Sequence, residues 1–436
     1  MDHEGAPVPF AEPGSGTVAV YRRATVIDGH GGPPQPSMTI VTDGPRIVRV
    51  APDDQVRESQ ADGEVFDLSG RFVIPGLIDS HQHIATPPDR TVAEATLRRH
   101  VYGGVTAIRI MADDLRQISD LDRASRVGEI PGPDIRYAAL MAGPSFFDDP
   151  RTWQVSQGET PGSVPWMQAI TDETDLPLAV AMARGTNAAA IKIYADLTGG
   201  KIAAITAEAR RQGIGVWAHG AVFPASPSEV IGAGVDSLSH VTMLAYEAAA
   251  EHLSTYSGKP PIDYDRFANG DDPMIDSLFA AMRSRDTILD ATASMWSRTW
   301  DAPADPDGQA RARANSALSA SLTAQAYRAG VSISTGTDYE TDPKHPFPAL
   351  HDEMAFLAKH CDIPVLEVIR SATLVGARSI GAEATMGTIE AGKLASFVIL
   401  AQDPVADIAN LDSITVVVRR GRRYPRSEYQ PEEAGQ

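Results

Sequence analysis

The middle of the chain alternates between apolar strand-like runs and helical patterns, and this alternation limits the fold more than any other feature. The strand-like runs lie at residues 71–84, 104–110, 135–141, 189–194, 215–219, 237–240, 287–292 and 331–335. Helical patterns separate them, for example at 91–101, 201–212 and 309–329. Eight such repeats predict an α/β protein built as a (β/α)8 TIM-like barrel. A doubly wound open sheet is the alternative, but no Gly-x-Gly-x-x-Gly follows any of these strands.

Both ends of the chain have a different, β-rich character. Short β-type runs at 18–27, 37–42 and 46–51 are separated by Asp-Gly turns, and similar runs recur at 395–401 and 414–419. These segments predict one small β-sandwich domain formed by both termini. The expected division is 1–75 for the N-terminal part of the sandwich, 76–384 for the barrel, and 385–436 for the C-terminal part.

The overall charge narrows the range of partners. The 436 residues include 38 Lys and Arg against 57 Asp and Glu, a formal charge of -19. This excess of acid argues against nucleic acid or an anionic membrane as the main partner. The expected partner is therefore a small-molecule substrate, and the chain is expected to form a homo-oligomer.

Compartment signals are few. The single cysteine, Cys361, excludes an intrachain disulfide and fits a reducing compartment. Residues 1–16 lack the pattern of a secretory signal, and no apolar run reaches membrane-spanning length. A cytoplasmic location is therefore expected.

The first strand of the alternating region ends in His81-Gln-His83. Alternate residues of a strand point to the same face, so the two imidazoles can bind one divalent metal. An isolated His-x-His is more often a pair of surface histidines, but here the apolar run Val-Ile-Pro-Gly-Leu-Ile-Asp leads directly into it. A barrel brings the carboxyl ends of all its strands to one face. At or near the ends of later strands stand Lys192, His219, His240 and Asp338.

These strand-end motifs resemble those of the amidohydrolase superfamily, in particular its binuclear prolidase-like and imidazolonepropionase-like members. The matching segments are 76–83, 191–193, 218–220, 239–240, 335–338 and the closing segment 387–400. The closing segment departs from the family pattern at Ser396, where Asp is usual, which puts a local turn contact in doubt.

The resemblance implies a ligand set and two metal ions, expected to be Zn²⁺. His81, His83 and Asp338 would bind the first ion, and His219 and His240 the second. Lys192 would bridge the ions after carboxylation of its Nζ by CO2. Independent chemistry is consistent with this role, because burial beside cations depresses the pKa of a lysine and frees its amine. The plainer interpretation of Lys192 is a lysine that extends to solvent and forms a salt bridge.

The resemblance also implies hydrolysis of an amide C–N bond. Asp338 would act as general base and then general acid, and His240 would help to orient the carbonyl. Loops after the strands carry specificity in such barrels. We expect the substrate to be bound by residues of these loops and of the fourth strand, namely Tyr194, Arg151, Trp153, Trp296 and Arg298. An N-acyl amino acid or dipeptide-like amide with an apolar or aromatic group would suit them.

Three other functions stay open. One is a mononuclear deaminase-type enzyme in which Lys192 is unmodified, and another is an esterase, lactonase or organophosphate hydrolase. A non-catalytic barrel that works by assembly is disfavoured, because every expected ligand is present. His351-Asp-Glu353 lacks the His-Glu-x-x-His spacing of a zinc motif and predicts the start of a surface helix.

Overall fold

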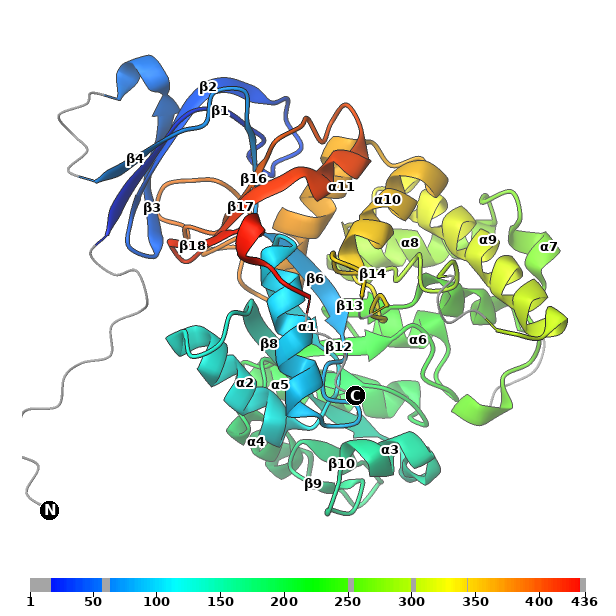
Figure 1. Ribbon diagram of the computed structural model, residues 1–436. Coiled ribbons are helices and arrows are strands. Elements are labelled where there is room, and N and C mark those ends of the chain that lie inside the picture. Colours follow the sequence, from blue (N-terminus) through cyan, green and yellow to red (C-terminus); the bar gives the residue numbers. More distant parts are fainter. Residues whose placement is uncertain (1–16, 57–62, 250–254, 299–302, 343, 432–436) are drawn as a thin grey trace, which may run out of the picture.

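The computed structural model describes residues 17–56, 63–249, 255–298, 303–342 and 344–431. The predictions on residues 1–16 lie outside this range. Figure 1 shows a small sheet made from both ends of the chain beside a barrel wrapped in helices. The predicted (β/α)8 barrel with a separate terminal β domain is confirmed.

The barrel wall consists of eight strands, and neighbouring strands are parallel. They are β6 (Leu77–Gln82), β7 (Val105–Ile110), β8 (Asp134–Ala142), β11 (Ala190–Ile193), β12 (Gly215–His219), β13 (Ser237–Ser239), β14 (Ile288–Asp290) and β15 (Ile333–Ser334). Two short strands, β9 (Ser163–Val164) and β10 (Met167–Ala169), lie beside the end of β8. The last strand meets the first where the amide of Ser80 donates to the carbonyl of Thr335 at 2.9 Å.

Helices alternate with these strands along the chain. They are α1 (Arg90–Tyr102), α2 (Leu115–Val127), α3 (Pro150–Val155), α4 (Leu176–Gly185), α5 (Gly199–Gln212), α6 (Pro227–Gly232), α7 (Tyr264–Phe267), α8 (Pro273–Arg285), α9 (Pro306–Arg328), α10 (Leu350–His360), α11 (Val365–Arg370) and α12 (Gly376–Ser379). Several begin at an aspartate whose carboxylate accepts a hydrogen bond from the first turn, as Asp89 does for Val92 in α1. Gly128 ends α2 in the left-handed conformation that glycine adopts at low cost.

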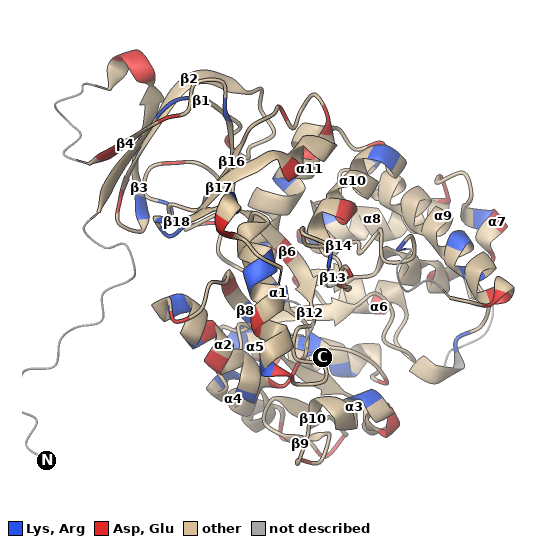
Figure 2. Ribbon diagram, viewed as in Figure 1, with Lys and Arg blue, Asp and Glu red and all other residues tan. Residues whose placement is uncertain are grey.

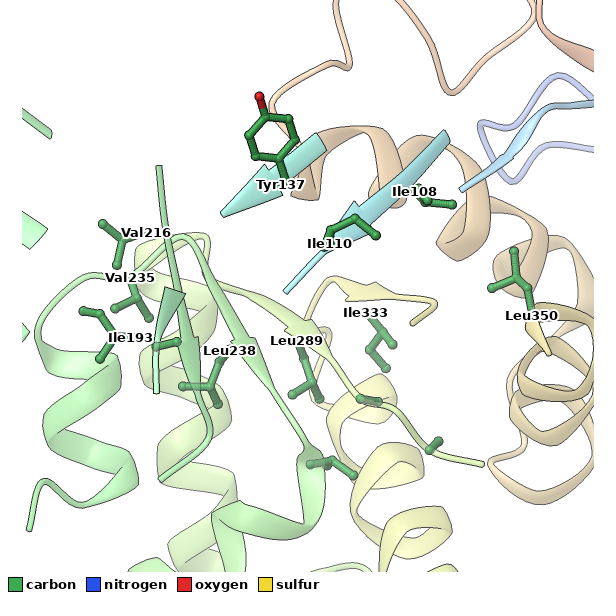
Figure 3. Packing of buried hydrophobic residues seen from close by; sticks show 14 of the residues in the cluster. Ile108, Ile110, Tyr137, Ile193, Val216, Val235, Leu238, Leu289, Ile333 and Leu350 are labelled. Carbon is green, nitrogen blue, oxygen red and sulfur yellow. The ribbon is translucent and has the colours of Figure 1, made fainter. Parts of the chain in front are cut away.

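Along a barrel strand, side chains point alternately toward the surrounding helices and toward the barrel interior. On β13, Leu238 packs into the apolar layer shared with the surrounding helices, as Ile193 of β11 and Leu289 of β14 do (Figure 3). Its neighbour Ser239 turns the other way and contacts Lys192 inside the barrel. The interior therefore carries polar groups at the level where the strands end.

The terminal domain is one hydrogen-bonded sheet of eight strands. These are β1 (Val18–Val26), β2 (Gln35–Asp43), β3 (Arg46–Pro52), β4 (Glu64–Asp67), β5 (Phe72–Pro75), β16 (Phe397–Leu400), β17 (Ile414–Arg419) and β18 (Arg422–Pro425). Most of its strands contribute to one apolar core, in which Tyr21 stacks on Phe66 and meets the edge of Phe397. The Ser396 hydroxyl accepts a hydrogen bond from the amide of Arg420 at 3.1 Å, so this position keeps a turn contact.

The run 71–84, expected as one strand, is two strands in different sheets. Strand β5 pairs with β16 of the terminal sheet, and β6 pairs with β7 of the barrel. The chain passes between the sheets at Gly76, where a Cβ atom would lie 2.0 Å from Oγ1 of Thr106. A residue with a side chain would therefore not fit at this crossing.

Two surface expectations have different outcomes. Among the described residues, no helix has both the length and the apolar character needed to cross a membrane. Figure 2 shows acidic and basic residues interspersed along the visible helices. The segment His351-Asp-Glu353 lies at the start of helix α10, as predicted, but only Asp352 of the three is exposed, and Glu353 is fully buried. Its carboxylate accepts hydrogen bonds from the backbone of the loop after β14, which compensates the burial.

Candidate active site

His81 and His83 stand at the carboxyl end of β6, each held by a carboxylate. Nδ1 of His81 lies 2.7 Å from Oδ2 of Asp290, and Nδ1 of His83 lies 2.8 Å from Oδ1 of Asp113. Because a carboxylate accepts the proton on Nδ1, each ring keeps Nε2 available as a metal ligand. Both Nε2 atoms face Oδ1 of Asp338, at 3.5 Å from His81 and 3.4 Å from His83.

His219 ends β12, and His240 directly follows β13. Nδ1 of His219 lies 3.1 Å from the carbonyl oxygen of Ala221, and Nδ1 of His240 lies 2.9 Å from Oγ1 of Thr292. The Thr292 hydroxyl donates to the carbonyl of Ala291, so it accepts from His240. Both imidazoles therefore carry the proton on Nδ1 and leave Nε2 free. Their ring centroids are 4.5 Å apart.

Asp338 follows β15 and completes the cluster. Its amide donates to the carbonyl of His81 at 2.9 Å, which ties the loop after the last strand to the first. One donor atom each from His81, His240 and Asp338 lie within 4.8 Å of one another. Asp338 and His240 adopt φ of 60° and 70°, a conformation that non-glycine residues rarely take. Such strain concentrates at functional sites.

Electrostatics keep most of these imidazoles neutral. Burial holds the pKa of His81, His219 and His240 well below the ordinary value of 6.5. His83 differs: burial opposes its charge, but the hydrogen bond to Asp113 raises its pKa above the ordinary value. Neutral imidazole is the form that binds metal, so the cluster fits a cation better than it fits a set of protonated histidines.

Lys192 lies inside the barrel on β11 and is fully buried. Its Nζ donates to Oγ of Ser239 at 3.3 Å, and that hydroxyl in turn donates to Oδ2 of Asp290 at 2.9 Å. Among the described residues, no carboxylate lies within ion-pair distance of this amine. Burial lowers the pKa of Lys192 from 10.5 to about 7. Close to neutral pH, the amine is therefore available without its proton.

The donor chemistry of these residues fits a divalent metal ion. Four imidazoles and one carboxylate surround a buried amine that carbon dioxide can convert into an anionic oxygen ligand. The structure brings all six predicted ligand positions to one end of the barrel. The assignment of ligands to a first and a second ion stays a prediction.

Two carboxylates that hold candidate ligands were not identified from the sequence. Oδ2 of Asp290 accepts from His81, from Ser239 and from the buried guanidinium of Arg109 at 3.0 Å. Asp113 accepts from His83 and from the amides of Ile84 and Ala85. Asp290 is the last residue of β14, and Asp113 lies three residues beyond β7. A carboxylate near the carboxyl end of a barrel strand is the signal that could have identified them.

A cavity of about 240 Å³ opens beside His83 and Asp338. Its wall is mainly apolar and comes largely from the two residues after β7, from β8 and from the segment after β8. The apolar lining includes Met111, Leu140, Phe146, Val155 and Met167. Tyr194 contributes its ring between this cavity and His219, whose ring centroid is 5.1 Å away.

The predicted substrate-binding residues are only partly brought together. Tyr194 and Arg151 line the cavity, but Arg151 is paired with Asp149 at 2.6 Å. The Trp153 side chain is 55% exposed and does not line it. Trp296 and Arg298 line separate hollows toward α9 and α10. Among the described residues, the expected apolar pocket is thus lined by methionine, leucine, valine and phenylalanine and not by tryptophan.

A (β/α)8 barrel with histidines and an aspartate gathered at the carboxyl ends of its strands defines a metal-dependent hydrolase. The sequence matches the model of the Amidohydrolase family over residues 72–424. The chain belongs to the amidohydrolase family and is a hydrolase that acts on carbon–nitrogen bonds.

Individual relatives are distant. A dihydroorotase of Anoxybacillus flavithermus is 34% identical over 95 residues, and the match spans only 21% of this chain and 21% of that protein. Among solved structures, a Xaa-Pro dipeptidase with bound methionine in its active site has a TM-score of 0.73 at 21% identity, covering 94% of this chain and 100% of that one. The ochratoxinase of A. niger has a TM-score of 0.74 at 19% identity, covering 96% and 98%. These two similarities concern the fold.

Proposed function

We propose that this protein uses a binuclear metal centre to hydrolyse the amide bond of an N-acyl amino acid or a dipeptide-like substrate. The observation that carries the proposal is the convergence of four imidazoles and Asp338 around the buried amine of Lys192. His81, His83 and Asp338 would hold one ion, and His219 and His240 the other.

Lys192 would bridge the two ions as a carbamate. Its neutral amine adds to CO2, a new N–C bond forms, and one proton leaves to water. The product is an anionic oxygen ligand in place of a buried ammonium, whose burial without a carboxylate partner is costly. The Ser239 hydroxyl, now beside Nζ, is positioned to hydrogen-bond to the modified side chain.

Two divalent ions bound here, expected to be Zn²⁺, would lower the pKa of a water molecule and polarise the substrate carbonyl. Asp338 accepts the proton that the attacking water loses and delivers it to the leaving nitrogen, first as general base and then as general acid. The ring of His240, held through Nδ1 by Thr292, would help to orient the carbonyl.

The cavity beside His83 supports a substrate with an apolar group of modest size. Its volume of about 240 Å³ and its mainly apolar wall suit an aliphatic or small aromatic group. The structurally similar Xaa-Pro dipeptidase holds methionine, an apolar amino acid, in its active site. This similarity supports a dipeptide-like amide for the present chain.

The test is metal content per chain, combined with intact mass under native conditions. We expect two metals and a CO2 adduct on Lys192. In Lys192→Ala we expect one metal or none, with metal content and activity recovering when a short-chain carboxylic acid is added. Hydrolysis of a panel of N-acyl amino acids and dipeptides should then follow the metal content.

Other outcomes point elsewhere. One metal with an unmodified Lys192 would favour the mononuclear deaminase, and ester or phosphotriester cleavage without amide cleavage would favour the other hydrolases. No bound metal at neutral pH after reloading would contradict the proposal. The cytoplasmic location and the homo-oligomer also remain predictions, and light scattering of the purified protein tests the second.

A further inference from the structure

The cationic side chains around the candidate site differ in the contacts that they already make within the chain. Arg151, which lines the apolar cavity, makes close contacts with Asp149, at 2.6 Å from Nη2 and 3.1 Å from Nε. Its charge is therefore satisfied by the chain itself. Arg298 faces the ring of Tyr339 at 5.7 Å and lines a hollow away from the cavity. Neither arginine is well placed to bind an anionic group of the substrate.

Lys259 is placed differently. It follows the short 3-10 helix η5 (Tyr256–Gly258), in the connection between β13 and α8. Its ammonium lies 3.5 Å from the ring centroid of Tyr256, a cation–π contact. The same ring meets His219 edge-on at 5.4 Å. Among the described residues, Lys259 has no carboxylate within 4.0 Å. Within the described part of the chain, Lys259 is thus a cation without a carboxylate partner, and only the ring of Tyr256 lies between it and the candidate metal ligand His219.

The turn that carries Lys259 is fixed to the barrel. The amide of Tyr256 donates to Oδ1 of Asp196 at 2.8 Å, and Oδ2 of Asp196 accepts from Ser145 at 2.7 Å. The rings of Tyr256 and Tyr194 meet at 5.6 Å. The positive charge of Lys259 adds to the effect of burial, which lowers the pKa of both His219 and His240. The ammonium is therefore held close to the site by defined contacts.

We infer that Lys259 binds the carboxylate of the substrate. This inference rests on the proposed function and names the residue that recognises the anionic end. The apolar cavity lies on the side of His83. Lys259 lines a second hollow, together with Thr242 and Met243, which closely follow His240 in the chain. An amide held between them would place its apolar group in the cavity and its carboxylate at Lys259. The ammonium would then form a charge-assisted hydrogen bond that a neutral substrate cannot form.

The experiment compares two substrates that differ only in this charge. N-benzoylglycine and N-benzoylglycinamide have the same scissile bond, and release of benzoate reports its cleavage. In the metal-loaded enzyme, Lys259→Met should raise KM for N-benzoylglycine by about 10- to 100-fold, the range expected for a hydrogen bond to a charged group. It should leave kcat within a few-fold and leave the kinetics with N-benzoylglycinamide unchanged.

Two further variants serve as controls. Lys259→Arg should restore most of the affinity for N-benzoylglycine. Arg311→Met removes a charge from the same hollow that Lys259 lines, so it should change neither substrate if the effect is local. Unfolding midpoints of all variants should match the wild type. Rising salt should increase KM for N-benzoylglycine in the wild type and not in Lys259→Met.

The outcomes separate the inference from the proposed function. If the wild type cleaves these amides and Lys259→Met affects both equally, the role of Lys259 is wrong while the function stands. If the wild type cleaves neither, the function fails for this class, and calorimetric binding of N-benzoylglycine still decides the inference. Binding that is lost in Lys259→Met and kept in Arg311→Met would support it. Equal binding in all variants would overturn it.

Discussion

At the scale of single residues, Asp290 contacts three polar side chains of the candidate site. Its Oδ2 accepts hydrogen bonds from His81, Arg109 and Ser239, and Ser239 in turn accepts from Lys192. One carboxylate thus orients an imidazole ligand and, through a hydroxyl, the amine on the neighbouring strand. We regard Asp290 as a positioning residue, because its contacts are with ligands and not with the substrate.

Replacing Asp290 with Asn should weaken metal binding more than folding. The amide oxygen of Asn can accept hydrogen bonds, but the amide nitrogen is a donor and the negative charge is lost. We expect the affinity for metal to fall by about 10- to 100-fold, as is typical when such an outer partner is removed. Titration with a chelating metal indicator measures this change. Wild-type metal affinity in Asp290→Asn would mean that His81 needs no carboxylate to orient it.

Gly336 is a second single-residue constraint. A Cβ atom at this position would lie 2.2 Å from Oδ1 of Asp290 and 2.9 Å from Cβ of His81. Gly336→Ala should therefore displace the loop that carries Asp338. We expect loss of most activity and a decrease of about 1–3 kcal/mol in the free energy of unfolding, as for overpacked sites.

Gly200→Ala is the matched control for this change. Gly200 lies in the first turn of α5, and a Cβ atom there meets nothing within 4 Å. Activity should stay at the wild-type level. Denaturant unfolding and steady-state kinetics on both variants check the prediction. Full activity in Gly336→Ala would show that the loop relaxes without moving Asp338.

At the scale of elements, α10 supports the loops after β14 and β15. Its buried Glu353 accepts from the amides of Ala293 and Ser294, at 2.8 and 2.6 Å. The hydroxyl of Ser294 lies 3.1 Å from that of Tyr339, which directly follows Asp338. The preceding Thr292 holds His240. A helix outside the barrel thus fixes the backbone that orients two candidate ligands, His240 and Asp338.

The contribution of Glu353 to the free energy of unfolding should decrease as pH rises. Burial raises the pKa of Glu353 from 4.5 to about 7, although the two amides favour its charged form. Between these values the folded protein holds a proton that the unfolded chain has released. Stability contributed by the protonated group is therefore lost as pH rises from 4.5 to 7. Compared with Glu353→Gln, the wild type should lose up to about 3 kcal/mol of unfolding free energy over this range.

Urea unfolding of both proteins at several pH values between 4.5 and 8 measures the difference. The variant removes the titrating group, so the gap between the two curves should change with pH and level off above about 7. Two curves that stay parallel over the whole range would contradict a raised pKa.

The strands, and the gathering of the candidate ligands at their carboxyl ends, could be predicted from the sequence, but the contacts that hold these side chains could not. Apolar runs give the eight strands because each must bury one face, and His219 ends its run. Asp290 also ends a strand, yet it is 209 residues from His81 in sequence, and no local pattern links them. The direction of a side chain in a connection between barrel strands, as at Trp153 of α3, depends on tertiary neighbours that the sequence alone does not specify.

At the scale of the whole molecule, one buried charge cluster joins the terminal sheet to the barrel. Asp134 begins β8 of the barrel and lies in contact with Arg419 and Arg420 at the end of β17, with Oδ1 2.9 Å from Nε of Arg420. Arg419 also donates to the carbonyl of Ser125 in α2 at 3.0 Å. Both Asp134 and Arg419 are buried. The docking of the two domains therefore depends on the contacts between Asp134 and the two arginines. Loss of the Asp134 carboxylate would leave the buried charge of Arg419 without a partner.

Asp134→Asn should weaken this docking. It leaves the buried Arg419 without its carboxylate, and we expect the free energy of unfolding to fall by about 3 kcal/mol near neutral pH. Asp67→Asn removes an exposed partner of Arg23 in the same terminal domain and should change stability far less. Guanidinium unfolding followed by far-UV circular dichroism measures both variants. A loss in Asp134→Asn no larger than that in Asp67→Asn would mean that this cluster does not hold the domains together.

The effect of Asp134→Asn should also depend on pH. Burial opposes the charge of Asp134, but the two arginines lower its pKa below the ordinary value of 3.8. The unfolded chain therefore takes up a proton at a higher pH than the folded one. The stabilisation is complete above pH 3.8 and is lost as pH falls through the folded pKa. The difference between wild type and Asp134→Asn should thus be constant from neutral pH to about 5 and shrink in stronger acid, because protonated Asp134 no longer compensates the arginines better than Asn does.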